Sequence, residues 1–188
     1  MRLQNSGLSL TELLICLTIF SIIITSLSGP DASSWRKRAE IDGIMQELMT
    51  SIGMARSFAI AENVVVTLCR SDDGRNCRGS WNDGYIVFTD WDANRILNGP
   101  DRVIAHAENF RSLGTLSYNS FRNRQYLQIT PRGFTDFQNG NFTFCSLSGN
   151  PQETRQIIIS VSGRARYARD KDGDGIVENS QGKPVICG

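Results

Sequence analysis

The residues with the most distinctive binding chemistry lie near the C-terminal end of the chain. Residues 163–171 read Gly-Arg-Ala-Arg-Tyr-Ala-Arg-Asp-Lys. If this segment is extended, Arg164 and Arg166 project to one face, because side chains alternate along a strand. Two guanidinium groups on one face can bind successive phosphates of a nucleic-acid backbone, and Arg169 and Lys171 extend the cationic track. The segment therefore predicts DNA contact. The alternative is that these arginines form a solvated strand face or a contact with another subunit.

An acidic loop follows directly. Asp170, Asp172 and Asp174 alternate with other residues before a glycine, and this D-x-D-x-D-G opening resembles a calcium loop. Gln181 stands at the twelfth position, where an EF-hand places a bidentate Glu, and no flanking helices are evident. An acidic turn without metal is therefore the preferred interpretation, with calcium as the alternative. A second acidic turn lacks the glycine and is a weaker candidate; it contains Asp90, Asp92, Asn94 and Asp101.

Catalysis has little support in the sequence. The single histidine, His106, has no obvious partner, no nucleophile elbow is present, and the carboxylates are scattered, mostly in turns. The net charge of +1 gives the whole chain no general attraction for nucleic acid or anionic lipid, so any such binding must be local. We predict a protein that is not an enzyme and that needs no cofactor, apart from the calcium alternative.

The cysteines indicate an oxidising compartment. Cys16 lies in an apolar run, whereas Cys69, Cys77, Cys145 and Cys187 lie in the remainder of the chain. Cys69 and Cys77 flank a polar turn and are natural partners, which leaves Cys145 to bind Cys187 near the C-terminus. Zinc is the competing interpretation, but the chain has no CxxC pair and one histidine. Two disulfides are therefore expected.

These residues must be positioned by the elements that the apolar pattern predicts. From about residue 33 to 62, apolar residues recur at three- and four-residue steps, which predicts a helix with one apolar stripe packed on the protein's own sheet. Short alternating runs separated by turn residues then predict strands and an antiparallel, sandwich-like head. The predicted strands cover residues 64–69, 85–90, 103–107, 114–118, 126–130, 141–147, 156–162 and 164–168.

The N-terminal apolar run contains a carboxylate. The run extends from Leu8 to Leu27 and fits the roughly 20 residues of a membrane-spanning helix. Glu12 lies inside it, where an unpaired charge costs about 2.5 to 3.5 kcal/mol, so Glu12 is a functional candidate. A signal peptide would place its small-residue cleavage site after the apolar core. Here Gly7 precedes the core, so cleavage after Gly7 would leave the helix on the mature protein. An uncleaved anchor is the alternative.

This arrangement resembles the class III leader of type IV pilins and type II secretion pseudopilins. The resemblance implies that a prepilin peptidase cuts after Gly7 and methylates the new N-terminus, Leu8, where phenylalanine is usual. It also implies that Glu12 neutralises the N-terminal amine of a neighbouring subunit during assembly. The basic residues Arg36, Lys37 and Arg38 outnumber Arg2 and favour the opposite topology by the positive-inside rule. The disulfides and the leader resemblance nevertheless place the head outside the cytoplasm.

Three segments of the head resemble the GspH/FimT family of minor pilins and pseudopilins. They are residues 64–69, the Trp-x-x-Gly-Tyr-x-Val-Phe pattern of residues 81–88, and Ser-Gly-Arg-Ala-Arg at residues 162–166. In family members associated with natural transformation, a Gly-Arg-x-Arg motif near the C-terminus contributes to DNA binding. Gly163, Arg164 and Arg166 match this motif.

The resulting expectation is an α+β protein with a long N-terminal transmembrane helix and a β-rich, antiparallel two-sheet head. The expected divisions are a leader at 1–7, the transmembrane and assembly helix at 8–28, its periplasmic half at 29–62 and the head at 63–188. The expected function is that of a minor pilin that binds double-stranded DNA during uptake. It would be a single-pass inner-membrane protein, with other pilins and the prepilin peptidase as partners, before it enters the pilus. The alternatives are a structural minor pilin that primes assembly and a type II secretion pseudopilin of the GspH class.

Overall fold

The computed structural model describes residues 9–27, 30–108 and 110–187, so the predicted cleavage site at Gly7 and Leu8 lies outside the described residues. The chain forms two compact units, residues 1–39 and residues 40–188. The first unit contains α1 (Leu10–Leu27) and the start of α2 (Pro30–Glu62). Proline is suited to a first helical position because its missing amide is unpaired there in any case. Helix α2 thus begins three residues earlier than the sequence pattern predicts.

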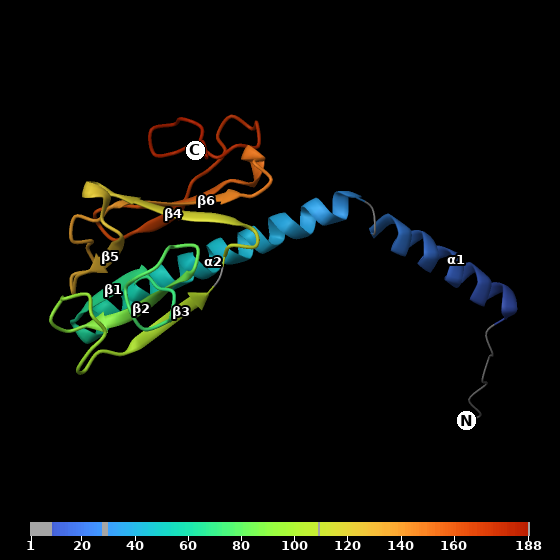
Figure 1. Ribbon diagram of the computed structural model, residues 1–188. Helices are drawn as coiled ribbons and strands as arrows, with labels where there is room; N and C mark the ends of the chain where they lie inside the picture. The colour runs from blue at the N-terminus through green and yellow to red at the C-terminus, as the bar shows by residue number, and fades with distance from the viewer. Residues whose placement is uncertain (1–8, 28–29, 109, 188) are drawn as a thin grey trace, which may run out of the picture. The chain divides into compact units, whose positions relative to one another are not determined.

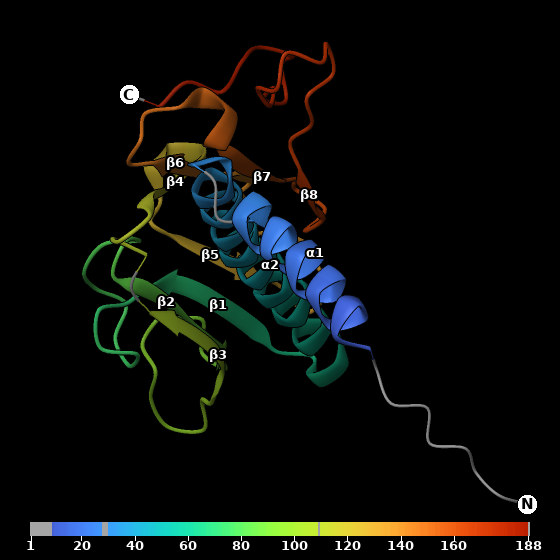
Figure 2. The same ribbon diagram turned by 90° about the vertical axis from the view of Figure 1, so that its right-hand side faces the viewer.

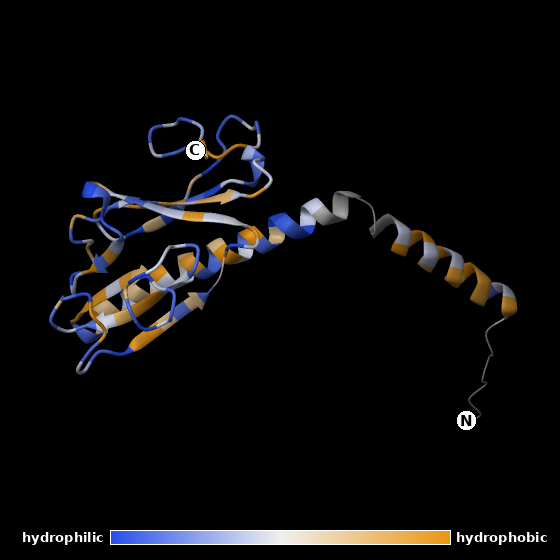
Figure 3. Ribbon diagram, in the orientation of Figure 1, coloured by the Kyte–Doolittle hydropathy of each residue, from blue (hydrophilic) through white to orange (hydrophobic). Residues whose placement is uncertain are grey.

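Helix α1 is the apolar segment of the sequence, and Figure 3 shows hydrophobic residues along most of its length. Its described side chains are exposed. Within the residues that the structure describes, no helix combines the length and the apolar character that a membrane span requires.

The head contains two four-stranded antiparallel sheets (Figure 1). The first has the strand order β3-β2-β1-β5 and the second β4-β6-β7-β8, with every pairing antiparallel. The strands are β1 (Val65–Arg70), β2 (Gly84–Asp90), β3 (Val103–Glu108), β4 (Gly114–Ser120), β5 (Tyr126–Ile129), β6 (Gly140–Ser146), β7 (Arg155–Ile159) and β8 (Ala165–Tyr167). The predicted fold class, α+β with an antiparallel two-sheet head, is confirmed.

The core lies where the inner faces of both sheets meet the part of α2 that belongs to the head. Figure 2 shows this part of α2 running beside the two sheets. The predicted apolar stripe of α2 is buried, and its most deeply buried members include Ile41, Leu48 and Ala55. These side chains pack in one cluster with Leu68 of β1 and Phe144 of β6, each fully buried. The helix therefore serves as a core element of the head from residue 40 onward.

One predicted strand is too long. The sequence predicts a strand over residues 156–162, but β7 ends at Ile159. Residues after it turn sharply, because the Gly163 amide donates to the Ser160 carbonyl over 2.9 Å and the Ser160 amide donates to the Arg164 carbonyl over 3.0 Å. Gly163 has a φ of 70°, which a side chain would disfavour. The strand thus ends because the chain forms a tight hairpin into β8.

Candidate nucleic-acid interface

The hairpin between β7 and β8 presents the two arginines of the predicted site. Arg166 lies in β8 opposite Ile158, and Arg164 lies at the end of the turn that precedes β8. Both line the same shallow hollow, together with Ile158, Ser160 and Ser162. Both are exposed, and among the described residues neither forms an ion pair. The hairpin therefore brings Arg164 and Arg166 to one face with their charges available to a ligand.

Tyr167 and Ala165 face the other side of β8. The Tyr167 hydroxyl donates to Gln46 Oε1 of α2 over 2.9 Å, and Ala165 packs against the core. Partial burial raises the pKa of Tyr167, and the Asp42 carboxylate raises it further. This alternation keeps the two arginines on the outer face of the sheet and places Tyr167 on the opposite face.

Gly163 is buried, and the fold requires that this position has no side chain. A Cβ atom at this position would lie 2.1 Å from the carbonyl oxygen of Gly133, which is too close for any side chain. The same carbonyl accepts a hydrogen bond from Arg56 Nε over 3.1 Å. Gly163 therefore lets the hairpin approach the β5–β6 loop and thereby sets the position of Arg164.

Arg169 and Lys171 lie beyond β8, in the segment that leads to the acidic loop. Both are exposed, and their backbones are held by Glu178. The Glu178 amide donates to the Arg169 carbonyl over 3.1 Å, and the Lys171 amide donates to the Glu178 carboxylate over 2.9 Å. Glu178 is 6% exposed. Its anchoring role is not evident from the sequence, because it depends on a backbone bridge between distant positions.

The three aspartates of the acidic loop lie together, with carboxylate oxygens within 4.8 Å of one another. All three side chains are exposed. Asp170 accepts the amides of Gly173 and Gly175 over 2.7 and 2.8 Å, and these bonds lower the pKa of its carboxyl. The turn is therefore set by backbone hydrogen bonds. Gln181 belongs to a separate turn, in which its amide donates to Asn179 Oδ1.

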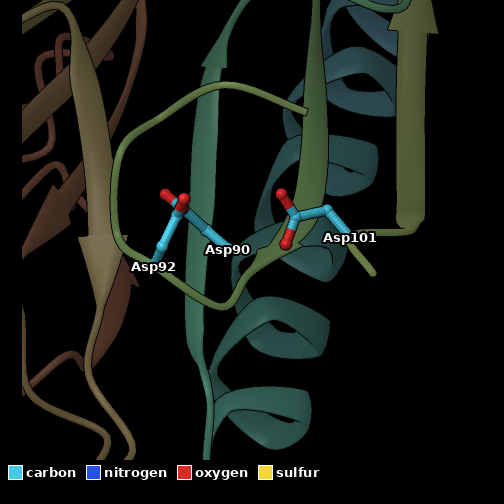
Figure 4. Close-up of side chains that lie close together, drawn as sticks. All are labelled: Asp90, Asp92 and Asp101. Carbon is cyan, nitrogen blue, oxygen red and sulfur yellow. The ribbon is translucent and has the colours of Figure 1, made fainter. Parts of the chain in front are cut away.

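The second acidic turn is centred on a buried carboxylate (Figure 4). Asp90 is fully buried, whereas Asp92 is exposed and Asp101 is intermediate. Thr67 Oγ1 donates to Asp90 Oδ2 over 2.6 Å, and Gln128 Nε2 donates to the same atom over 3.2 Å. The backbone amide of Asn94 donates to Asp90 Oδ1 over 2.9 Å, and that of Arg95 donates to Asp90 Oδ2 over 3.0 Å. Asp90 thus has internal hydrogen-bond donors and fixes the β2–β3 loop.

Both predicted disulfides are present. Cys69 is bonded to Cys77, and Cys145 is bonded to Cys187. The second bond fastens the C-terminal tail to β6, where residues 184–187 line a polar hollow with Thr115 and Ser117 of β4. Among the described residues, Cys16 of α1 is the one free cysteine.

Glu12 takes part in a helix cap that sequence reasoning missed. Its carboxylate accepts the Ser9 amide over 3.1 Å, and Ser9 Oγ accepts the Glu12 amide over 3.2 Å. This reciprocal arrangement is a capping box, and its Ser-x-x-Glu signature is present at the start of the apolar run.

Comparisons with a family model and with solved structures find proteins that are similar to this chain. A family model described as type II transport protein GspH matches residues 45–163. A crystal structure of the type IV minor pilin FimU from Pseudomonas aeruginosa is 20% identical, with a TM-score of 0.54, and the match covers 72% of this chain and 92% of that one. The minor pseudopilin EpsH from the type 2 secretion system of Vibrio cholerae is 10% identical, with a TM-score of 0.46, over 65% of this chain and 90% of that one. No curated protein matches.

Proposed function

The chain belongs to the GspH family of minor pilins and pseudopilins, and we propose that it is a minor type IV pilin whose head binds double-stranded DNA without sequence preference. The observation that carries the DNA proposal is the pair Arg164 and Arg166. These two residues share one hollow on the outer face of β8, and no ion pair among the described residues engages them. Guanidinium groups without an ion-pair partner bind phosphates well, because no carboxylate has to be displaced.

We infer that the protein is anchored in the inner membrane before it is assembled into a pilus. Cleavage by a prepilin peptidase after Gly7 would leave Leu8 as the methylated N-terminus, and the apolar helix would hold the protein in the inner membrane with the head in the periplasm. The two disulfides support an oxidising location for the head. Glu12 would pair with the N-terminal amine of a neighbouring pilin during assembly. Intact-mass measurement of the purified protein tests the cleavage, and a protein that retains Met1 would contradict it.

The DNA proposal is tested by titration of labelled duplex with the full-length protein in mild detergent at several salt concentrations. Binding through a few arginines should be weak and independent of sequence, with about 0.9 of a logarithmic unit of salt slope for each phosphate contacted. The double variant Arg164→Gln/Arg166→Gln should bind every duplex more weakly and show a slope lower by about 2. The control Arg75→Gln/Lys183→Gln removes the same charge from two other exposed positions and should bind as the wild type does.

Two alternatives remain in the same family. In one, the chain is a structural minor pilin that primes assembly; in the other, it is a type II secretion pseudopilin. Equal DNA binding by the wild type and the arginine double variant would favour these roles.

A further inference from the structure

The β4–β5 loop lies at the same end of its sheet as Arg164. Across the second sheet, Ser120 of β4 is opposite Gly140 of β6, Gly140 is opposite Ile159 of β7, and Ile159 is opposite Ala165 of β8. These four residues form one row at one end of the sheet, whose four strands are labelled in Figure 2. Three strand spacings separate the end of β4 from the start of β8, which is roughly 14 Å.

This loop combines an exposed aromatic ring with cationic side chains. It reads Phe-Arg-Asn-Arg over residues 121–124, and Phe121 is 54% exposed. The Arg122 guanidinium lies 5.5 Å from the centroid of the Phe121 ring and forms no ion pair among the described residues. Arg124 is less available, because its Nη1 atom lies 3.9 Å from the Asp136 carboxylate. Phe121 and Arg122 are therefore the aromatic and the cationic side chain of this loop that are most available to a ligand.

The loop is held in one conformation. Ser120 Oγ donates to the Arg124 carbonyl over 2.7 Å, and the Phe121 amide donates to the Asn139 carbonyl over 3.1 Å. Arg122 and Asn123 both adopt positive φ angles, 61° and 52°. Strained non-glycine residues of this kind gather at binding sites, where the surrounding structure maintains them.

A neighbouring loop adds a second arginine–aromatic contact. Arg95 Nη1 donates to the Tyr126 hydroxyl over 2.9 Å, and the Arg95 guanidinium lies 4.9 Å from the centroid of the Tyr126 ring. Arg95 also has a positive φ angle, 66°. Tyr126 begins β5, directly after the Phe121 loop. Arg95 and Tyr126 therefore add a second positive charge and a second aromatic ring next to the loop that contains Phe121 and Arg122.

We propose that Phe121 and Arg122 form a second nucleic-acid contact that takes an unpaired strand. The ring of Phe121 stacks on an exposed base while Arg122 binds an adjacent phosphate, and the strand continues along the end of the sheet to Arg164. Stacking needs a base whose face is free, so this contact favours single-stranded over double-stranded DNA. This inference rests on the proposed DNA-binding function and adds the class of nucleic acid that the loop takes.

The test compares a labelled single-stranded oligothymidine with a hairpin duplex of equal charge, using the full-length protein in detergent. Phe121→Leu keeps apolar bulk but removes the π-face, and it should weaken single-strand binding by roughly 5- to 100-fold while changing duplex binding less than about twofold. Phe121→Trp should retain single-strand affinity. Arg122→Gln should weaken binding and lower the salt slope by roughly one for each phosphate lost. Leu147→Ala, which alters an exposed apolar residue just beyond the opposite end of β6, should have no effect.

The outcomes separate this inference from the proposed function. If Arg164→Gln/Arg166→Gln weakens binding and Phe121→Leu does not, the loop contact is wrong and the DNA-binding function stands. If Phe121→Leu weakens single-strand and duplex binding equally, the stacking role is wrong. If the wild type binds neither DNA at low salt, both the function and the loop contact are wrong.

Discussion

Ser9 and Glu12 cap helix α1 reciprocally: Glu12 Oε2 accepts the Ser9 amide over 3.1 Å, and Ser9 Oγ accepts the Glu12 amide over 3.2 Å. The carboxylate thus has a helix-capping role within its own chain. The pilin resemblance gives the same carboxylate a second role, toward the N-terminal amine of a neighbouring subunit. These two roles can be separated, because Ser9 contributes to the cap alone.

We predict that Ser9→Ala and Glu12→Ala differ in filament assembly. Loss of the cap costs about 1 kcal/mol in either variant. Glu12→Ala also leaves an amine without a counter-charge in apolar surroundings, a penalty of about 2.5 to 3.5 kcal/mol, so its incorporation should fall at least about tenfold. Immunoblotting of purified filaments against the membrane fraction measures this ratio. Equal incorporation of the two variants would show that Glu12 acts as a cap alone.

The two disulfides should differ in how much they stabilise the head. Cys69–Cys77 closes a loop with a sequence separation of 8, and Cys145–Cys187 closes one of 42. Because the longer loop removes more entropy from the unfolded chain, Cys145→Ser/Cys187→Ser should lower the free energy of unfolding by about 4 kcal/mol and Cys69→Ser/Cys77→Ser by about 2.5 kcal/mol. Urea denaturation of both double variants checks the order, and a larger loss from the short loop would contradict it.

The elements of the head could be predicted from sequence because burial on one face imposes a periodicity. All eight predicted strands and the stripe of α2 occur, including the short β8. Periodicity says nothing about backbone turns, so the strand predicted over residues 156–162 extended past Ile159 into the hairpin. Pairing of the four cysteines could also be predicted, since a polar turn separates the first two.

The arrangement of the candidate sites could not be predicted from the sequence, because it depends on contacts between residues that are far apart in the chain. Asp90 appeared to be a weak cation ligand, but Thr67 and Gln128 from two other strands supply two of its hydrogen bonds. The aromatic and basic pattern of residues 121–124 is readable in the sequence. Its position at the same end of the sheet as Arg164 cannot be read from the sequence, because that position follows from the register of four strands. The Ser9–Glu12 cap was the exception, since its local motif was available and was missed.

Replacement of Gly163 by any other residue should be destabilising for a steric reason, in addition to the cost of its positive φ angle. Gly149 and Gly163 share a φ of 70°, but a Cβ atom at Gly149 would meet nothing within 4 Å, whereas one at Gly163 would lie 2.1 Å from the Gly133 carbonyl oxygen. Gly149→Ala should therefore cost roughly 1 to 3 kcal/mol of unfolding free energy, and Gly163→Ala should cost more. Urea denaturation of the two variants compares them directly. Equal losses would mean that the β5–β6 loop moves freely to accommodate a side chain.

The acidic loop should oppose DNA binding by the arginines that precede it. Asp170, Asp172 and Asp174 are exposed and follow Arg166 within eight residues, so their charges repel the phosphates that the arginines attract. Asp170 should not be altered in this test, because its oxygens accept the amides of Gly173 and Gly175 and hold the turn. Asp172→Asn is the better probe, since it removes one charge and retains an oxygen that can accept the Asp174 amide. At low salt and without calcium, where charges are least screened, it should strengthen duplex binding by up to a few fold.

The effect of calcium on duplex binding should show whether residues 170–174 form a calcium site or an acidic turn without metal. If the loop takes the ion, calcium cancels the repulsion, so the wild type should bind duplex more tightly with calcium than with magnesium at equal ionic strength. Asp172→Asn should then lose most of this calcium effect, because one ligand charge is missing, while Asp92→Asn in the other acidic turn should keep it. The measurement is the same duplex titration with each cation, with Arg164→Gln/Arg166→Gln as a second reference. If calcium and magnesium act alike on the wild type, the ions merely screen the phosphates, and the aspartates of residues 170–174 form a turn without a calcium site.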